Sequence, residues 1–345
     1  MDERVRGSGW NRVAAAAGAV LLAALVLMLG GCTSLRVWMG SRVRLEKVPV
    51  ERMEAWLPQG PAMYPGQTTP LVVAVTDTAG KILLTEGAGN GKVLWDDLVV
   101  TPALMAANRK GMVTMPADPR VTDTAFPSLT VTAPSHPWIF TKLDVFLRYD
   151  HDFAANFSGR NGRSGMDGSN GIDGTSGMSG STDLENPSPG GDGSDGTDGG
   201  DGDDGGAGED AGPVRVLLTL RSGGNPLLQA EVSGKGRDEY FLVDPVGGSL
   251  TVKAEGGSGG AGGRGGRGGR GGSGGSGWPS GSSGRDGRDG RDGFPGAPGK
   301  GGRITVVYDP AARPYLSLLT LSSRDGNGRK GPDPVFTEQA VPPLW

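Results

Sequence analysis

Cysteine and histidine are nearly absent from this chain, and their scarcity limits the chemistry it can perform. Its 345 residues include one cysteine, Cys32, and two histidines, His136 and His151. A single cysteine excludes an intramolecular disulfide, so packing and backbone hydrogen bonds must hold the fold together. Two isolated histidines make neither a zinc site nor a nucleophile–base pair. The sequence therefore carries no catalytic or cofactor-binding signature, and we expect a protein that is not an enzyme.

Aromatic residues and net charge are also scarce. Phe, Trp and Tyr make up 6% of the chain, and the formal net charge is −4 at pH 7. A nearly balanced charge provides no general attraction to nucleic acid. Aromatic side chains do not alternate with the basic clusters, as they do where bases stack in single-strand binding sites. Nucleic acid is therefore not among the expected partners.

Only one long apolar run is present, near the N-terminus. It covers 17 residues, Val13 to Leu29, and follows a basic start. This length is short for a membrane-spanning helix and suits the core of a signal peptide. The run ends in Leu29-Gly30-Gly31-Cys32, which resembles the lipobox of bacterial lipoproteins.

The lipobox resemblance implies cleavage between Gly31 and Cys32 and attachment of fatty acids such as palmitate to Cys32. Thr33 follows the cysteine, where an aspartate would indicate retention in the inner membrane. We therefore expect a lipid anchor in the bacterial outer membrane, on its periplasmic or cell-surface face. Residues 1–31 are then the signal peptide and residues 32–47 a tether. An uncleaved anchor helix with an incidental cysteine is the alternative.

Residues 48–150 have the pattern of a β-sandwich. Apolar residues alternate with others around Leu71–Thr76 and Leu143–Leu147, and turn signals separate such segments. The stretch PGQTTPLVVAVTDTAGK, residues 65–81, resembles the opening of bacterial immunoglobulin-like domains, which implies an immunoglobulin-like sandwich. The large apolar residues of this region are expected in its core: Met53, Trp56, Trp95 and Trp138.

A second β unit is expected within residues 151–322, where strands alternate with glycine-rich segments. Strand patterns occupy 213–255, which predicts an antiparallel meander, and return in 303–321 with a strand over 315–321. Residues 323–345 are mostly polar and are predicted to be a C-terminal tail. The fold class is thus mainly β, and the mature chain contains no long amphipathic helix.

Glycine is abundant, with 65 residues, and much of it recurs at every third position. Four runs have this period, which we number one to four: 159–180, 190–208, 256–277 and 281–302. A polyproline II-like helix has three residues per turn, so this spacing leaves one side chain-free face along its length. At about 3.1 Å per residue, each run would extend about 60 to 70 Å.

Three structures are compatible with these runs: an intramolecular polyglycine II bundle, a collagen-like trimer, or flexible linkers. Matched lengths and the short links at 181–189 and 278–280 favour antiparallel hairpins within one monomer. Runs one to three contain no proline, and run three repeats Gly-Gly-X, which leaves two faces bare where collagen needs one. A bundle resembles certain phage adhesin tips and arthropod antifreeze proteins, and it is the favoured interpretation.

Charge is segregated among the runs. Run two is acidic and includes Asp192, Asp195, Asp201 and Asp204; run three is basic, with Arg264, Arg267 and Arg270. These seven residues are candidate ion or polyanion contacts, and opposite charges on neighbouring runs are predicted to select the arrangement. GGDGSD and GGDGDD in run two resemble the first six positions of the calcium-binding nonapeptide of bacterial toxins, but the large apolar residue at position eight is missing. Loose calcium binding is therefore only an alternative.

These features predict an envelope-anchored structural or adhesive lipoprotein that displays a rigid glycine-rich module. The alternatives are a polysaccharide- or calcium-binding surface protein and a collagen-like trimeric protein. Expected partners are the membrane, through the lipid anchor, and envelope polysaccharide or another surface protein.

Overall fold

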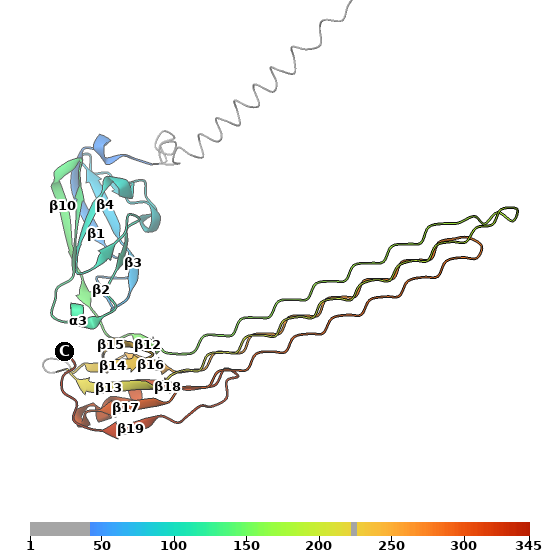
Figure 1. Cartoon of the computed structure of the whole chain (residues 1–345). Helices are drawn as coiled ribbons and strands as arrows, with labels where there is room; N and C mark the ends of the chain where they lie inside the picture. The colour runs from blue at the N-terminus through green and yellow to red at the C-terminus, as the bar shows by residue number, and fades with distance from the viewer. Residues whose placement is uncertain (1–41, 222–225) are drawn as a thin grey trace, which may run out of the picture. The chain divides into compact units, whose positions relative to one another are not determined.

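The computed structural model describes residues 42–221 and 226–345 and is mainly β. The proposed signal peptide, Gly31, Cys32 and most of the tether lie outside the described residues. The chain divides into two compact units, and the boundary between them falls between Arg148 and Tyr149. The two units are described separately below (Figure 1).

Within residues 42–148, the first unit forms four small sheets. One has the order β1–β4–β5 (Val50–Trp56, Val72–Asp77 and Ile82–Leu84), and a second has the order β10–β9–β6 (His136–Asp144, Ser128–Ala133 and Val99–Ala103). A third has the order β3–β8–β7 (Thr68–Pro70, Met112–Thr114 and Ala106–Ala107), and β11 pairs with β2 (Phe146–Leu147 and Ala62–Met63). Short helical turns lie between them: η1 (Leu45–Lys47), η2 (Gly87–Gly89), η3 (Trp95–Asp97) and α3 (Pro119–Thr122).

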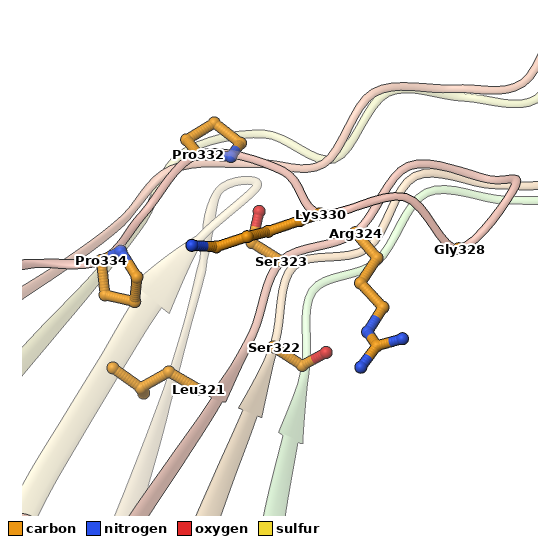
Figure 2. Close-up of a pocket in the computed structure, with 8 residues that line it drawn as sticks. All are labelled: Leu321, Ser322, Ser323, Arg324, Gly328, Lys330, Pro332 and Pro334. Carbon is orange, nitrogen blue, oxygen red and sulfur yellow. The ribbon is translucent and has the colours of Figure 1, made fainter.

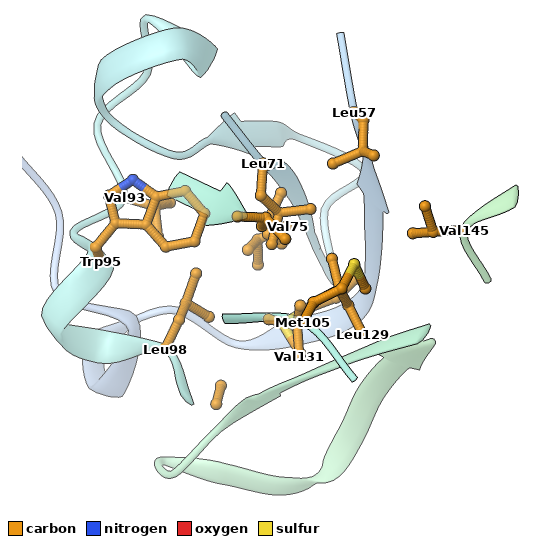
Figure 3. Close-up of a cluster of buried hydrophobic side chains, with 14 of the residues drawn as sticks. Leu57, Leu71, Val75, Val93, Trp95, Leu98, Met105, Leu129, Val131 and Val145 are labelled. Carbon is orange, nitrogen blue, oxygen red and sulfur yellow. The ribbon is translucent and has the colours of Figure 1, made fainter. Parts of the chain in front are cut away.

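Alternation along the strands builds one hydrophobic core in this unit. In β9, Leu129 and Val131 are fully buried while their neighbours are partly exposed, and Val75 of β4 packs into the same cluster (Figure 3). Met53 and Trp95 are buried, as the sequence predicted.

The prediction for the other two residues was wrong. Trp56 is 39% exposed and Trp138 is 90% exposed. Trp138 lies on the outward face of β10, and the next residue, Ile139, is partly buried on the opposite face. His136 is the first residue of this strand.

The predicted tether is too long by at least six residues. Leu45 is fully buried in the core of the first unit, and Arg44 forms an ion pair with Asp97 at 2.8 Å. Val43 also pairs as an isolated β-bridge with Val93. Residues 42–47 are therefore part of the first unit.

The second unit contains a five-stranded and a three-stranded sheet. The larger has the order β15–β14–β13–β17–β19 (Arg237–Val243, Leu228–Gly234, Val214–Leu220, Ile304–Tyr308 and Val335–Glu338). The smaller has the order β12–β16–β18 (Asp152–Asn156, Ser249–Lys253 and Leu319–Ser322). The predicted antiparallel pairing holds only for β13, β14 and β15, since β12–β16–β18 and β13–β17–β19 are parallel. Parallel pairing follows because strands of the same direction are joined through long excursions of the chain.

The C-terminal segment also differs from its prediction. Most of the strand expected at 315–321 is a 3-10 helix, η4 (Pro310–Leu318), and only β18 remains extended. The predicted tail supplies β19 to the large sheet, and Val341 is buried, with its carbonyl accepting a hydrogen bond from Thr219. A β-strand and a buried residue thus make this segment part of the second unit.

Candidate functional site: the glycine runs

Each glycine run continues a strand of the second unit. Run one follows β12 and run two leads into β13, while run three follows β16 and run four leads into β17. Figure 1 shows these segments as extended chains lying side by side. The chain reverses at both links, so run two is antiparallel to run one and run four is antiparallel to run three.

The register of the sheets continues into the runs. β12 and β16 pair with an offset of 97 residues, and the same offset relates run one to run three, as in the bond between Asn161 and Ser258. β13 and β17 pair with an offset of 90, which also relates run two to run four. The offset falls from 97 to 90 because the link 181–189, between runs one and two, is longer than the link between runs three and four. The strands therefore set the alignment of all four runs.

Backbone hydrogen bonds join the runs at every third residue. Glycine N–H groups of run one donate to carbonyls of run three at 2.6–2.8 Å, and those of run two donate to run four at 2.8–2.9 Å. Further bonds of 2.7–3.0 Å connect run two with run one, run three with run two, and run four with run three. Runs two and three are each bonded to all three others, whereas runs one and four share no such bond. We refer to these four hydrogen-bonded runs as the glycine array.

Close backbone contacts explain the glycine period. A Cβ at Gly263 would lie 1.9 Å from the carbonyl oxygen of Met166 in run one, and one at Gly262 would lie 2.0 Å from that of Gly293 in run four. Atoms cannot approach so closely, so both positions require glycine. Run three has two glycine columns because one approaches carbonyls of run one and the other approaches carbonyls of run four. A Cβ at Gly206 of run two has more room, with its nearest neighbour, the Arg163 nitrogen, 3.1 Å away.

Aspartate and asparagine side chains provide further acceptors for backbone N–H groups. Thirteen of them accept such a bond through Oδ1, at 2.6–3.0 Å, from the adjacent run. They are Asn161, Asp167, Asn170 and Asp173 of run one, Asp192, Asp195, Asp198, Asp201 and Asp204 of run two with Asp210 just beyond it, and Asp286, Asp289 and Asp292 of run four. We call these residues side-chain caps. Their role as caps was not predicted from the sequence, although the regular Asp-Gly spacing was the signal.

The predicted pairing of opposite charges between runs is not observed. Among the described residues, no ion pair joins Arg264, Arg267 or Arg270 to an aspartate of run two. The candidate residues Asp192, Asp195, Asp201 and Asp204 instead bind backbone N–H groups of run four. A charge-assisted hydrogen bond from a backbone N–H to a carboxylate is stronger than a neutral one, whereas an exposed ion pair contributes only about 0–1 kcal/mol to stability.

The three arginines lie on an exposed column of run three. Arg267 and Arg270 line a shallow groove of about 370 Å³ together with Asp173 of run one and Asp286 of run four. Acidic and basic side chains thus line the same groove. Near the sheets, Lys235 donates to Glu209 at 3.0 Å, and this bond lowers the pKa of the Glu209 carboxyl.

A third, much shorter hairpin lies beside the array. It connects β18 with β19, and its Arg324-Asp325-Gly326 repeats the Arg-Asp-Gly triplets of run four. Gly256 N–H donates to the Arg324 carbonyl at 2.8 Å, and Gly326 N–H donates to the Gly299 carbonyl at 2.9 Å. The hairpin therefore continues the array for about one triplet. The sequence analysis had assigned it to the polar tail.

A pocket of about 390 Å³ lies under this third hairpin (Figure 2). The Ser323 hydroxyl donates to the Gly302 carbonyl at 2.7 Å, and Lys330 forms an ion pair with Asp333. Figure 2 shows the Arg324 and Lys330 side chains pointing in different directions. These cations do not converge on one anion, so the pocket has no clear ligand-binding geometry.

Three apolar side chains are exposed at the distal end of the runs. Met178 is 87% exposed, Leu184 in the link 181–189 is 95% exposed, and Trp278 in the second link is 74% exposed. The Trp278 N–H donates to the Ser188 carbonyl at 2.9 Å, and this bond joins the two links.

Residues 42–221 and 226–345 contain neither a candidate metal-binding cluster nor a membrane-spanning helix. In these ranges no group of three or more His, Cys, Asp or Glu side chains is placed to hold a metal ion. No helix there has the length and apolar character needed to cross a membrane. No protein-family model matches the chain, and comparisons with characterised proteins and with solved structures give no significant match.

Proposed function

We propose that this protein is a non-enzymatic bacterial lipoprotein, anchored in the outer membrane through Cys32, with a structural or adhesive role. The first unit would be an immunoglobulin-like sandwich, and the glycine array a polyglycine II bundle displayed at the envelope. The lipobox-like Leu29-Gly30-Gly31-Cys32 supports the anchor. Several acyl chains on one cysteine give stable attachment, since each buried methylene contributes about 0.8 kcal/mol.

The observation that carries the structural role is the hydrogen-bond network of the glycine array. Every run is bonded to at least two others, and the close-contact glycine columns admit no other side chain. Such cross-bonded chains resist bending far better than an isolated glycine-rich segment, which behaves as a flexible coil. A stiff module of about 60 to 70 Å, at about 3.1 Å per residue, suits reach or spacing at a cell surface.

Membrane fractionation of cells that express the full chain tests the anchor. We expect the wild-type protein in the outer-membrane fraction and the Cys32→Ala variant to lose its lipid. A Cys32→Ala protein that still carries labelled palmitate would contradict the proposal. Light scattering with circular dichroism tests the bundle: a monomer with an extended-helix signal supports it, whereas a trimer that dissociates on melting supports a collagen-like assembly.

The exposed arginine column favours a second candidate function, binding of an anionic envelope polysaccharide. Arg264, Arg267 and Arg270 recur at every third residue and form no ion pair with the acidic run. An Arg264/Arg267/Arg270→Gln variant should lose retention on an immobilised anionic polysaccharide at low salt. The matched Arg285/Arg288/Arg291→Gln variant of run four, which removes equal charge, should retain more. Equal loss in both variants would indicate only non-specific attraction.

A further inference from the structure

One edge of the glycine array has the hydrogen-bonding groups to receive a further run. In run one, glycine N–H groups from Gly159 onward donate to backbone carbonyls of the parallel run three. With the offset of 97 residues, Gly256 of run three corresponds to Gly159 of run one. The Gly256 N–H donates to the Arg324 carbonyl of the third hairpin. This column of run three is therefore built to bind another parallel chain.

The third hairpin occupies this edge only at its start. Beyond it, the same column donates to side chains: Gly265, Gly268 and Gly271 bind Oδ1 of Asp292, Asp289 and Asp286, respectively, at 2.7–2.8 Å. The column thus binds a backbone carbonyl of the third hairpin at Gly256, and it binds an aspartate at Gly265, Gly268 and Gly271, which lie beyond the hairpin. The aspartates occupy the acceptor position of a further run.

Proline modifies the neighbouring edge of run four. In run two, Gly205 and Gly208 donate their N–H groups to run four. The corresponding residues of run four, 90 positions later, are Pro295 and Pro298, which have no N–H group. These prolines therefore remove two donors that another run would need.

We propose that Asp286, Asp289 and Asp292, together with Pro295 and Pro298, close an edge that would otherwise add glycine runs from a second copy of this chain. The partner is a second copy because this edge continues the interface that run one makes with run three. Native β-sheets block their exposed edges by comparable means, with charged side chains and proline. The proposal rests on the glycine array and is independent of lipid anchoring.

The test compares two variants of the full chain, purified in one detergent and studied by sedimentation velocity over a range of concentrations. Asp286/Asp289/Asp292→Ala removes the three acceptors. Asp286/Asp289/Asp292→Asn has the same net charge as the alanine variant but keeps an acceptor oxygen at each position, as Asn161 and Asn170 do in run one. We expect the alanine variant to shift from monomer to dimer and larger species as concentration rises. The asparagine variant should sediment like the wild type.

Two results would overturn the proposal. One is an alanine variant that stays folded and monomeric at every concentration; the other is equal association of both variants, which would indicate charge repulsion instead of blocked acceptors. If the alanine variant unfolds, the Pro295→Gly/Pro298→Gly variant provides the test, because it restores two N–H donors and removes no hydrogen bond of the array. This variant should associate, and a monomer would reject the proposal. A wild-type chain without an extended-helix dichroism signal would instead reject the array itself.

Discussion

At the residue scale, glycine positions of the same period are not equivalent. In run three, a Cβ added at either glycine column would clash with a carbonyl oxygen of another run. A Cβ at Gly263, for example, would lie only 1.9 Å from the Met166 oxygen. In run two, the residue after each repeated glycine varies, and Ser194 and Thr197 accept N–H bonds there through their hydroxyls. The Gly-Gly-X pattern predicted two bare faces on run three, but no residue pattern identified which carbonyl each column meets.

Two glycine-to-alanine substitutions should therefore differ sharply. Gly263→Ala places a methyl group against a backbone oxygen that other hydrogen bonds hold in place, and we expect a loss of about 3 kcal/mol or more. In Gly206→Ala the methyl group would lie 3.1 Å from the Arg163 nitrogen, so run one needs to shift by only a few tenths of an ångström. The substitution also restricts the unfolded chain, so its net effect should stay within about 1 kcal/mol. Thermal unfolding followed by circular dichroism measures both. Equal destabilisation by the two variants would contradict the assigned contacts.

At the element scale, the strands and runs share one register. The number, length and hairpin connection of the runs could be predicted from period and link length alone. The third hairpin could not, because a single Arg-Asp-Gly triplet is too short to show a period. Its relation to β18 and β19 becomes evident only once both strands are paired in parallel with their counterparts. Parallel pairing between distant strands leaves no local mark in a sequence, which is why the meander was predicted to extend too far.

A shared register predicts that the array tolerates shortening only when all four runs change together. One triplet can be removed from each run at the same level: 168–170, 199–201, 265–267 and 289–291. This matched deletion should shorten the array by about 9 Å, at about 3.1 Å per residue, and leave the melting temperature nearly unchanged.

The control is deletion of 168–170 alone. It keeps the triplet phase, so Asp173 takes the place of Asn170 opposite Arg267, but run one then ends one triplet short. The distal triplet of runs two and three loses its bonds to run one, and the link 181–189 must span the gap. We expect a clear drop in melting temperature and in the extended-helix dichroism signal. If the single and matched deletions behave alike, the runs are not aligned by the sheets.

At the scale of the whole molecule, each unit has its own set of fully buried residues. The core of the first unit includes Leu129 and Val131, and the sheets of the second unit bury Leu218 and Leu250. The sequence located both β regions from their alternating patterns. It missed the contributions of residues 42–47 and of the C-terminal segment, because one buried leucine or one four-residue strand is too little signal to distinguish from a tether or a tail.

Separate cores predict separate unfolding transitions. Leu129→Ala and Leu250→Ala each remove a fully buried leucine side chain, and each should cost about 2–5 kcal/mol. Differential scanning calorimetry of the full chain should show that the first variant lowers one transition and the second lowers the other. Circular dichroism assigns them, because only the transition affected by Leu250→Ala should carry the extended-helix signal: β16 leads directly into run three. A single transition that both variants lower equally would show that the two units unfold as one cooperative structure.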